Sequence, residues 1–440
     1  MSGIAEVLLN LGYKVSGSDI AETDVTRRLA SLGAVVSHGH RAGNVGSAHV
    51  VVISSAVKPD NPEIIEARRN DIPVIPRAEM LAELMRLRWG IAIAGTHGKT
   101  TTTTLVAHVL AQGGLDPTAV IGGKVNAFGS NVKLGQGRFI VAEADESDGS
   151  FLRLTPVIAV VTNIDPEHME HYGTLDNLLD SFTKFADSIP FYGLAVLCMD
   201  SENVRSILGR VEKRVVTYGL SHQAEYRPED IRLEGLVSKF QVVHRGKELG
   251  EITAPAPGVH NVLNALASVV VGLELEIPFA DIRKGIAAYQ GIRRRFQIKY
   301  NSKDLLVVDD YGHHPEEIRA TLAAARAAYP DRRIVVAFQP HRYSRTQHLH
   351  REFKDAFDDA DFLILTGIYS AGEDPIPGVT GELIYDDVIE AGHRAATYVP
   401  KSADVVPLLK EVTKPGDVVI TMGAGDIYKV GEKFIEVISK

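Results

Sequence analysis

The stretch IAIAGTHGKTTTTTLVAHVLAQGG, residues 91–114, constrains the fold more than any other part of the sequence. An apolar run leads into a short loop that contains Gly95 and Gly98, and a helical run follows directly. A strand that enters a helix in this way is typical of parallel α/β sheets, which bind ligands at the carboxyl ends of their strands. The N–H groups of the loop and the helix dipole favour an anion there. The stretch therefore predicts an α/β chain with a phosphate-binding loop.

The residue types in this loop indicate a nucleotide. Lys99 can reach the β- and γ-phosphates, and the Thr100 hydroxyl can bind Mg²⁺. The usual pattern G-x-x-x-x-G-K-[ST] is not met, because Ile93 stands at its first glycine. A glycine-rich turn before a buried helix is the alternative, but the strand, the helix and the Lys-Thr pair in register favour nucleotide binding. The residues expected to contact the nucleotide are Gly95, Thr96, His97, Gly98, Lys99, Thr100 and Thr101.

Two later loops offer acidic side chains for a metal ion. Each follows an apolar strand, in RFIVAEADESD and in VIAVVTNIDPEHMEHYG. Glu143 is nearest the end of its strand and is the best-placed Mg²⁺ ligand, whereas a solvated surface explains the other acids of that loop equally well. His168 in the second loop cannot be assigned from spacing, because Mg²⁺ prefers oxygen ligands.

Length and composition limit the class of protein. A chain of 440 residues predicts about three domains. The net charge of −9 argues against a general nucleic-acid or anionic-membrane surface. The single cysteine, Cys198, excludes an intramolecular disulfide and is best explained as a small core residue. No apolar run approaches the roughly 18 residues of a membrane span, and the start lacks a signal-peptide pattern, so we expect a cytoplasmic protein.

Strand-like and helical runs alternate along most of the chain, which predicts α/β domains with parallel sheets. We place the three domains at residues 1–88, 89–292 and 293–440. The first is expected to be Rossmann-like with a buried strand at 49–57, the second a P-loop ATPase-type domain, and the third Rossmann-like. Shorter alternating strands at 213–255 predict a small antiparallel sheet inserted in the second domain.

The beginning of the sequence is unusual for a Rossmann-like domain. Ile4, Val7, Leu8 and Leu11 share one helical face, and Gly12 is a suitable stop. A strand follows at 14–19, but none precedes the helix, so this domain is expected to lack its first strand. The residues alone thus indicate a three-domain enzyme that uses ATP and Mg²⁺, with kinase, ATPase and ligase activities all open.

A resemblance to a known family favours one of these three activities. Six motifs occur in the following order: GTHGKTTT, EADESD, VTNIDPEHM, HNVLNA, DDYGHHP and FQPHRYSRT. Together they resemble the Mur ligase family over nearly the whole chain, and that family also omits the first glycine of the phosphate-loop pattern. The resemblance implies a cytoplasmic amide-bond ligase for peptidoglycan precursors. Its first domain would bind the UDP substrate, its second ATP, and its third would close over both and admit the amino acid.

The resemblance also implies roles for individual residues. The residues expected to act on the reacting groups are Lys99, His168, Arg295, His313, Arg342 and Arg345. Further nucleotide contacts are expected from Asn261, Asn264, Arg295 and Asp310, although capping and packing would also explain the two asparagines. Substrate contacts are expected from Asp19, His40, Ser54, Ser55, Tyr311, His314, Arg342 and Arg345. The expected metal ligands are Thr100, Glu143 and His168.

The implied cofactors are ATP and Mg²⁺, and the implied substrates are UDP-N-acetylmuramate and L-alanine. We expect no nucleic-acid or membrane partner, and a monomer or weak homodimer. Members of the family begin with a strand and a glycine-rich loop, so a truncated or mis-started chain with weakened binding of the UDP substrate is expected. Two alternatives stay open: a sister ligase that attaches a preformed peptide to the same UDP-sugar, and a truncated non-catalytic nucleotide-binding relative.

Overall fold

A computed structural model describes residues 1–54, 57–122 and 132–439 of the chain. The chain divides into two compact units. The first unit comprises Met1–Asp230, Phe240–Thr253 and Leu263–Tyr289, and the second unit comprises Ile231–Lys239, Ala254–Val262 and Gln290–Lys440. No helix within the described residues combines the length and the apolar character that a membrane crossing requires.

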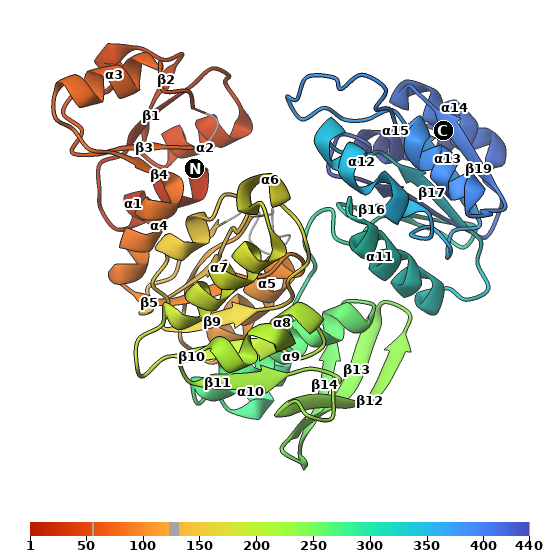
Figure 1. Ribbon diagram of the computed structural model, residues 1–440, viewed down its shortest axis with the longest axis horizontal. Coiled ribbons are helices and arrows are strands. Elements are labelled where there is room, and N and C mark those ends of the chain that lie inside the picture. The colour runs from red at the N-terminus through yellow and green to blue at the C-terminus, as the bar shows by residue number, and fades with distance from the viewer. Residues whose placement is uncertain (55–56, 123–131, 440) are drawn as a thin grey trace. The chain divides into compact units, whose positions relative to one another are not determined.

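The N-terminal part of the first unit alternates helices and short strands, labelled in Figure 1. Its elements are α1 (Ser2–Asn10), β1 (Ser16–Asp19), α2 (Asp24–Ser31), β2 (Val35–His38), β3 (Val51–Ile53), α3 (Pro62–Arg69), β4 (Val74–Pro76) and α4 (Arg77–Arg86). The expected first helix is confirmed, with Ile4 and Val7 buried and Gly12 at a φ of +85°.

The strands of this part form two separate parallel pairs, β1 with β2 and β3 with β4. The expectation of a buried strand at 49–57 is wrong in extent, because β3 is short and only half-buried. Within the described residues β3 pairs with β4 alone, so one edge of this strand has no neighbouring strand. Helix α4 packs differently, because its Leu81, Leu84 and Met85 belong to the hydrophobic core that also contains the central strands.

The middle region of the chain forms a ten-stranded sheet. Its strand order is β14-β13-β12-β11-β10-β9-β5-β8-β6-β7. Its strands are β5 (Trp89–Ala94), β6 (Thr118–Val120), β7 (Val132–Lys133), β8 (Phe139–Glu143), β9 (Ile158–Val161), β10 (Leu194–Cys198), β11 (Val215–Tyr218), β12 (Tyr226–Glu234), β13 (Val237–His244) and β14 (Lys247–Ala254). Strand β5 runs parallel to β8 on one side and to β9 on the other. Its middle residues are fully buried, as the apolar run predicts.

The strands expected to form a separate inserted sheet instead extend this central sheet. Strand β12 joins β11 through a single parallel pair, Tyr218 with Tyr226. Alternating apolar residues reveal that such strands exist, but they carry no information about which edge the strands join. The prediction of strands was therefore correct, and the prediction of an independent sheet was wrong.

The helices of the middle region are α5 (Lys99–Gln112), α6 (Met169–Tyr172), α7 (Leu175–Asp187), α8 (Glu202–Ile207), α9 (Val259–Glu274) and α10 (Phe279–Ala287). Helix α5 packs closely against α10. The close approach of these two helices depends on Gly285, where an added Cβ would lie 2.7 Å from Cα of Val109. This packing fixes the helix that begins at the phosphate-binding loop.

The second unit contains a six-stranded sheet with the order β15-β16-β20-β17-β18-β19. It is parallel except for the pair β15–β16. Its elements are β15 (Gln297–Asn301), β16 (Leu305–Asp310), α11 (Pro315–Ala328), β17 (Ile334–Phe338), α12 (Tyr343–Leu349), β18 (Phe362–Thr366), α13 (Glu382–Glu390), β19 (Ala396–Val399), α14 (Val405–Val412), β20 (Asp417–Met422) and α15 (Tyr428–Ile438).

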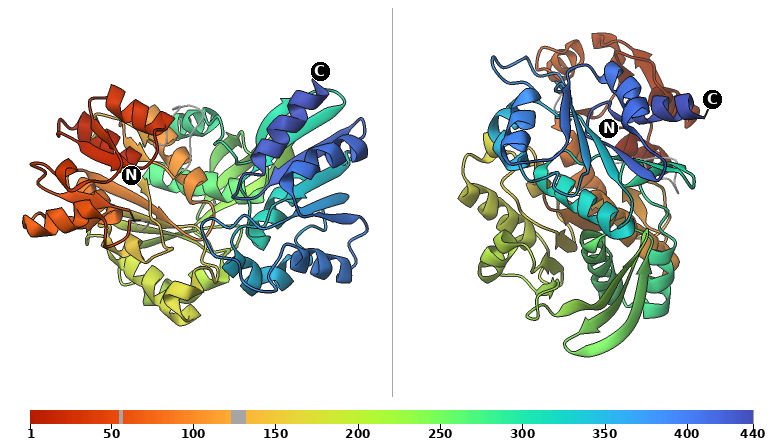
Figure 2. Two further views of the ribbon diagram at one scale, coloured as in Figure 1. Left: turned by 90° about the horizontal axis from the view of Figure 1, so that it is seen from above. Right: turned by 90° about the vertical axis from the view of Figure 1, so that its right-hand side faces the viewer.

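Alternate residues of these strands enter two different hydrophobic cores, one on each face of the sheet. Val336 packs in the core that contains residues of α11 and α13, whereas the neighbouring Val335 packs in the core that contains residues of α14 and α15. Figures 1 and 2 show the helices on both sides of this sheet. Continuous apolar runs such as RRIVVAF follow from this burial on both faces.

Candidate active site

The phosphate-binding loop connects β5 to α5 and requires glycine at two points. Gly95 has a φ of +134°, and a Cβ there would lie 2.1 Å from Oγ1 of Thr162. Gly98 has a φ of +82°, and a Cβ there would lie 2.6 Å from Oδ1 of Asn264. Ile93, which replaces the first glycine of the usual pattern, is fully buried and pairs with both neighbouring strands. A side chain at that position therefore contributes to the core and leaves the loop free.

Two amides of this loop bond to the loop that follows β9. The N–H of Thr96 donates to the backbone oxygen of Asn163 at 3.2 Å, and the N–H of His97 donates to Oδ1 of Asn163 at 2.7 Å. Thr162 donates its hydroxyl to the carbonyl of His97 at 2.6 Å. The expectation that the loop amides face an anion therefore does not hold for these two. Amides of the first turn of α5 have no intrahelical acceptor and remain suited to that task.

The side chain of Lys99 bends back over its own loop. Its Nζ donates to the carbonyl oxygens of Gly95 and Thr96 and to Oε1 of Glu146, at 2.9 Å from Glu146. Burial alone would lower the pKa of Lys99, but the carboxylate of Glu146 outweighs it, so the pKa is raised and the amine is protonated. The loop thus holds a fixed positive charge, as the sequence predicts, but an acid supplied from 47 residues away pairs with it.

The three expected metal ligands come from adjacent strands. Glu143 ends β8, Thr100 lies in the first turn of α5 directly after the β5 loop, and His168 lies in the loop after β9. The strand order β9-β5-β8 therefore brings all three to the same edge of the sheet. The hydroxyl and carboxylate oxygens of Thr100 and Glu143 are donors that suit Mg²⁺.

Glu143 and His168 both have defined surroundings at this edge. Oε1 of Glu143 accepts from the N–H of Gly122 at 2.7 Å. His168 has a φ of +57°, and its Nε2 and Nδ1 lie 3.6 Å from Glu167 and 3.7 Å from Glu170, respectively. The imidazole therefore lies between the carboxylates of Glu167 and Glu170.

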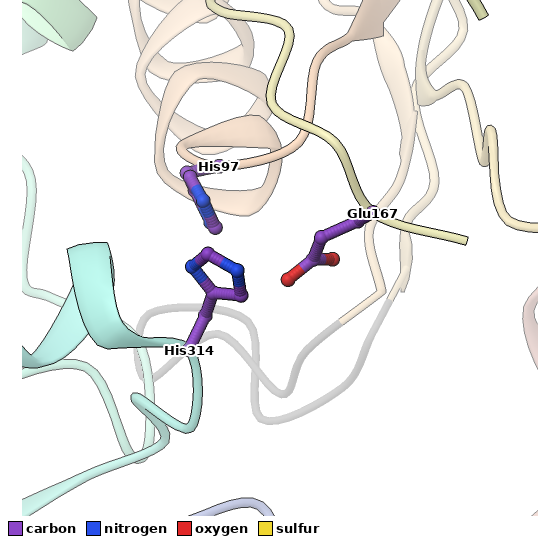
Figure 3. Close-up of side chains that lie close together, drawn as sticks. All are labelled: His97, Glu167 and His314. Atoms are coloured by element: carbon purple, nitrogen blue, oxygen red, sulfur yellow. The ribbon is translucent and has the colours of Figure 1, made fainter. Parts of the chain in front are cut away.

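The side chain of His97 faces the acids of the loop after β9. Its Nε2 lies 3.2 Å from Oδ2 of Asp165, and the ligand atoms of His97 and Glu167 are within 4.8 Å of each other. Figure 3 shows His97 and Glu167 extending into the same space from their two loops. The second loop is thus bound to the first through both backbone and side-chain contacts.

Helix α9 contains the two asparagines expected at the adenine. Asn264, in the first unit, is buried, and its Oδ1 accepts from the Thr102 hydroxyl at 3.1 Å. Asn261, in the second unit, donates from Nδ2 to the carbonyl of Pro257 at 2.7 Å. These contacts agree with the packing and capping alternative, while the adenine contacts stay predictions.

The residues expected on the UDP side lie after parallel strands of the N-terminal part. Asp19 is exposed at the end of β1, where its Oδ1 accepts from the N–H of Ala21 at 3.0 Å. The Ser18 hydroxyl lies 2.9 Å from Nδ1 of His40 and donates to Glu63 at 2.8 Å. Ser54 is half-buried after β3, and Ser55 lies outside the described residues. Asp19 and His40 therefore occupy the same edge of the β1–β2 pair.

In the second unit, the loop after β16 gathers aromatic and charged side chains. The guanidinium of Arg295 lies 5.4 Å from the ring centre of Tyr311 and 3.4 Å from Oε1 of Glu317. Nδ1 of His313 lies 3.3 Å from the other oxygen of Glu317. The buried His314 instead caps α11, where its Nδ1 accepts from the N–H of Glu316. Arg295, Tyr311 and His313 thus lie together as expected side chains of this site, whereas His314 stabilises the first turn of α11.

Arg342 and Arg345 join this group through His341. The His341 ring lies 5.6 Å from the His313 ring, and its Nδ1 lies 3.3 Å from Nη1 of Arg345. Burial, together with the charges of His313 and the two arginines, lowers the pKa of His341 to about 3, so this ring is neutral. Arg342 has a φ of +71°, and its Nε lies 4.0 Å from Glu373.

Asp310 ends β16 with its side chain buried. It accepts from the N–H groups of Phe296 and Gly312, both at 2.7 Å. The neighbouring Asp309 binds Arg294, whose guanidinium also lies over the Tyr311 ring at 5.0 Å. These bonds hold the backbone around Arg295 in place, and the expected nucleotide contact of Asp310 stays a prediction.

Several residues at these sites could not be selected from the sequence. Glu146 was one of several equivalent acids, and Thr162, Asn163 and Thr102 belong to apolar or threonine-rich runs. Glu317 was detectable, because it stands three residues after His314 at the position of a capping-box acid.

The sequence matches known families and proteins over nearly its whole length. It matches the Mur ligase family catalytic domain over residues 1–89, the Mur ligase middle domain over 93–272 and the Mur ligase glutamate ligase domain over 294–425. UDP-N-acetylmuramate–L-alanine ligases of Geotalea uraniireducens (strain Rf4) and Geobacter sulfurreducens are 59% and 58% identical to it over 436 residues. These alignments cover 99% of this chain and 95% and 94% of theirs.

Solved structures agree with these matches. A UDP-N-acetylmuramate-alanine ligase from Thermotoga maritima superimposes with a TM-score of 0.83 at 30% identity, covering 100% of this chain and 96% of that chain. A murein peptide ligase from Psychrobacter arcticus shares the fold, with a TM-score of 0.71 at 23% identity over 100% of this chain and 96% of its own. The expected three-part α/β architecture is confirmed, and the chain belongs to the Mur ligase family.

Proposed function

We propose that the chain joins L-alanine to the lactyl carboxylate of UDP-N-acetylmuramate, with ATP converted to ADP and phosphate, in the synthesis of peptidoglycan precursors. The observation that carries this proposal is near-full-length identity of 58–59% to two ligases named for these substrates. The phosphate-binding loop and its buried lysine support the use of ATP. The cytoplasmic location and the monomeric or weakly dimeric state stay predictions.

The chemistry of the reaction explains why this loop is needed. A carboxylate is a poor electrophile, so ATP has to phosphorylate it before an amine can attack. The amine of L-alanine then attacks the acyl phosphate, and the tetrahedral intermediate collapses to an amide and phosphate. Lys99, whose amine is protonated, is suited to stabilise negative charge on the transferring phosphoryl group.

Thr100 and Glu143 would hold Mg²⁺, and His168 would bind a second ion, which together supply positive charge beside the phosphates. The side chains of the second unit would serve the other reactants. Arg295 would reach the γ-phosphate, and Tyr311 and His313 would lie on the L-alanine side. Arg342 and Arg345 would hold a phosphate or carboxylate.

A phosphate-release assay tests the proposed function. Release is expected only when ATP, UDP-N-acetylmuramate and L-alanine are all present. Lys99→Ala should reduce turnover by about 100-fold or more, the usual effect of removing one preorganised charge-stabilising donor. Lys284→Ala is a matched control, because Lys284 is an exposed lysine of the same unit.

Two outcomes would contradict the proposal. Turnover of Lys99→Ala close to that of the control would remove the phosphate loop from the reaction. Faster release with an L-alanine-containing tripeptide than with L-alanine would favour the peptide-ligase alternative. Circular dichroism of each variant checks that its fold is retained.

A further inference from the structure

The ion pair between Lys99 and Glu146 has a property that the proposed reaction does not use. An ammonium group has three N–H donors, and all three of Lys99 have acceptors: Gly95, Thr96 and Glu146. Only the contact to Glu146 involves an opposite charge. A phosphate oxygen can therefore bind this amine only by replacing one of these three acceptors. Of the three, only the Glu146 carboxylate is negatively charged, as a phosphate oxygen is.

The carboxylate of Glu146 is held in place from its backbone. The carbonyl oxygen of Glu146 accepts from the Tyr172 hydroxyl and from the N–H of Gly149. The side chain is 4% exposed, and its Oε2 is buried with no hydrogen-bond partner among the described residues. A buried carboxylate with one unsatisfied oxygen is costly, and its pairing with Lys99 compensates for part of that cost.

We propose that Glu146 competes with the phosphates of the nucleotide for Lys99 and so weakens nucleotide binding. This inference rests on the proposed function, in which Lys99 binds those phosphates. When the phosphates leave, the carboxylate restores the third contact of the amine. Glu146 thereby favours release of the nucleotide product.

The substitution Glu146→Gln tests the competition. Glutamine has nearly the same shape and can still accept a hydrogen bond from Lys99, but it lacks the charge. We expect the dissociation constant for ADP to decrease about tenfold, or about 1.4 kcal/mol, because the phosphate then displaces a hydrogen bond to a neutral amide instead of a stronger one to a carboxylate. Isothermal titration of the full chain with ADP and Mg²⁺ measures this change.

Two further variants make the test specific. Asp148→Asn removes one negative charge from an exposed position of the same loop, and the ADP affinity should stay unchanged. The double variant Lys99→Ala/Glu146→Gln should bind ADP no more tightly than Lys99→Ala, because the competition requires the amine. A general loss of negative charge would instead strengthen binding in all three variants.

The possible outcomes are distinct. If the wild-type chain binds no ADP, the proposed function fails and this inference with it. If the wild-type chain binds ADP and Glu146→Gln binds it equally or more weakly, only the inference is overturned. Should Glu146→Gln not fold, Glu146→Asp shortens the side chain by one methylene and should tighten ADP binding to a smaller extent. An unchanged affinity of Glu146→Asp would then overturn the inference.

Discussion

Replacing Gly95 with alanine should destabilise the first unit through the close approach of two loops. The φ of +134° is a conformation that side chains rarely adopt. The added Cβ would lie 2.1 Å from Oγ1 of Thr162 and 3.0 Å from the carbonyl oxygen of Asn163. Thr162 would have to move away and lose its hydrogen bond to His97. The loop would therefore be strained by both conformation and contact.

Gly114→Ala separates these two causes. Gly114 follows the opposite end of α5 with a φ of +76°, and a Cβ there would meet nothing within 4 Å. Only the left-handed backbone cost of about 1–2 kcal/mol applies there, reduced by about 0.4–1 kcal/mol because alanine restricts the unfolded chain. For Gly95→Ala, backbone strain, overpacking and a lost hydrogen bond together predict about 4 kcal/mol or more.

Urea unfolding monitored by tryptophan fluorescence can measure the difference. Trp89 is the single tryptophan of the sequence and begins β5, the strand that leads into Gly95. The free energy of unfolding should fall by about 3 kcal/mol more for Gly95→Ala than for Gly114→Ala. Equal effects of the two substitutions would refute the argument that close contact requires glycine at position 95.

Three other properties can be predicted from the structure. Arg28→Ala should cost about 2 kcal/mol of unfolding free energy, because it leaves the buried carboxylate of Glu6 without its partner, whereas replacement of the exposed Arg27 by alanine should cost far less. Similar values in urea unfolding would contradict this. Burial raises the pKa of Asp309 from 3.8 to about 6, so between about pH 4 and 6 the folded chain binds more protons than the unfolded chain. The free energy of unfolding should therefore fall as the pH rises through this range. Asp309→Asn should remove up to about 3 kcal/mol of this fall, and parallel pH profiles of variant and wild type would disprove it. Burial also raises the pKa of Cys198 to about 11, so a thiol reagent at pH 8 should modify it much more slowly in the folded chain than in denaturant. Equal rates would show that the thiol is accessible.

Local sequence patterns were sufficient to predict the phosphate-binding loop. The apolar run before Gly95, the Lys-Thr pair and the following helical run each act over a few residues, and the structure places them in β5 and α5. Likewise, Pro315 occupies the first turn of α11, a position that suits proline. Such features could be predicted because the chemistry that decides them lies within one turn of helix or one strand.

Contacts between distant segments could not be predicted in the same way. Glu146 stands among several acids of one loop, and only the folded chain shows that it is the partner of Lys99. Asn163 binds two amides of the phosphate loop, and that of His97 lies 66 residues away in the sequence. The junction of β11 with β12 rests on one residue pair. In each case the partner is chosen by packing of the sheet, which a single sequence does not encode locally.

In the proposed reaction, this chain forms an amide through a phosphorylated carboxylate of UDP-N-acetylmuramate. Mass spectrometry of one reaction tests it most directly, with the lactyl carboxylate labelled with oxygen-18 and ATP and L-alanine unlabelled. We expect a UDP-N-acetylmuramoyl-alanine product together with inorganic phosphate that carries one labelled oxygen. Phosphate without the label, or no amide product, would contradict it.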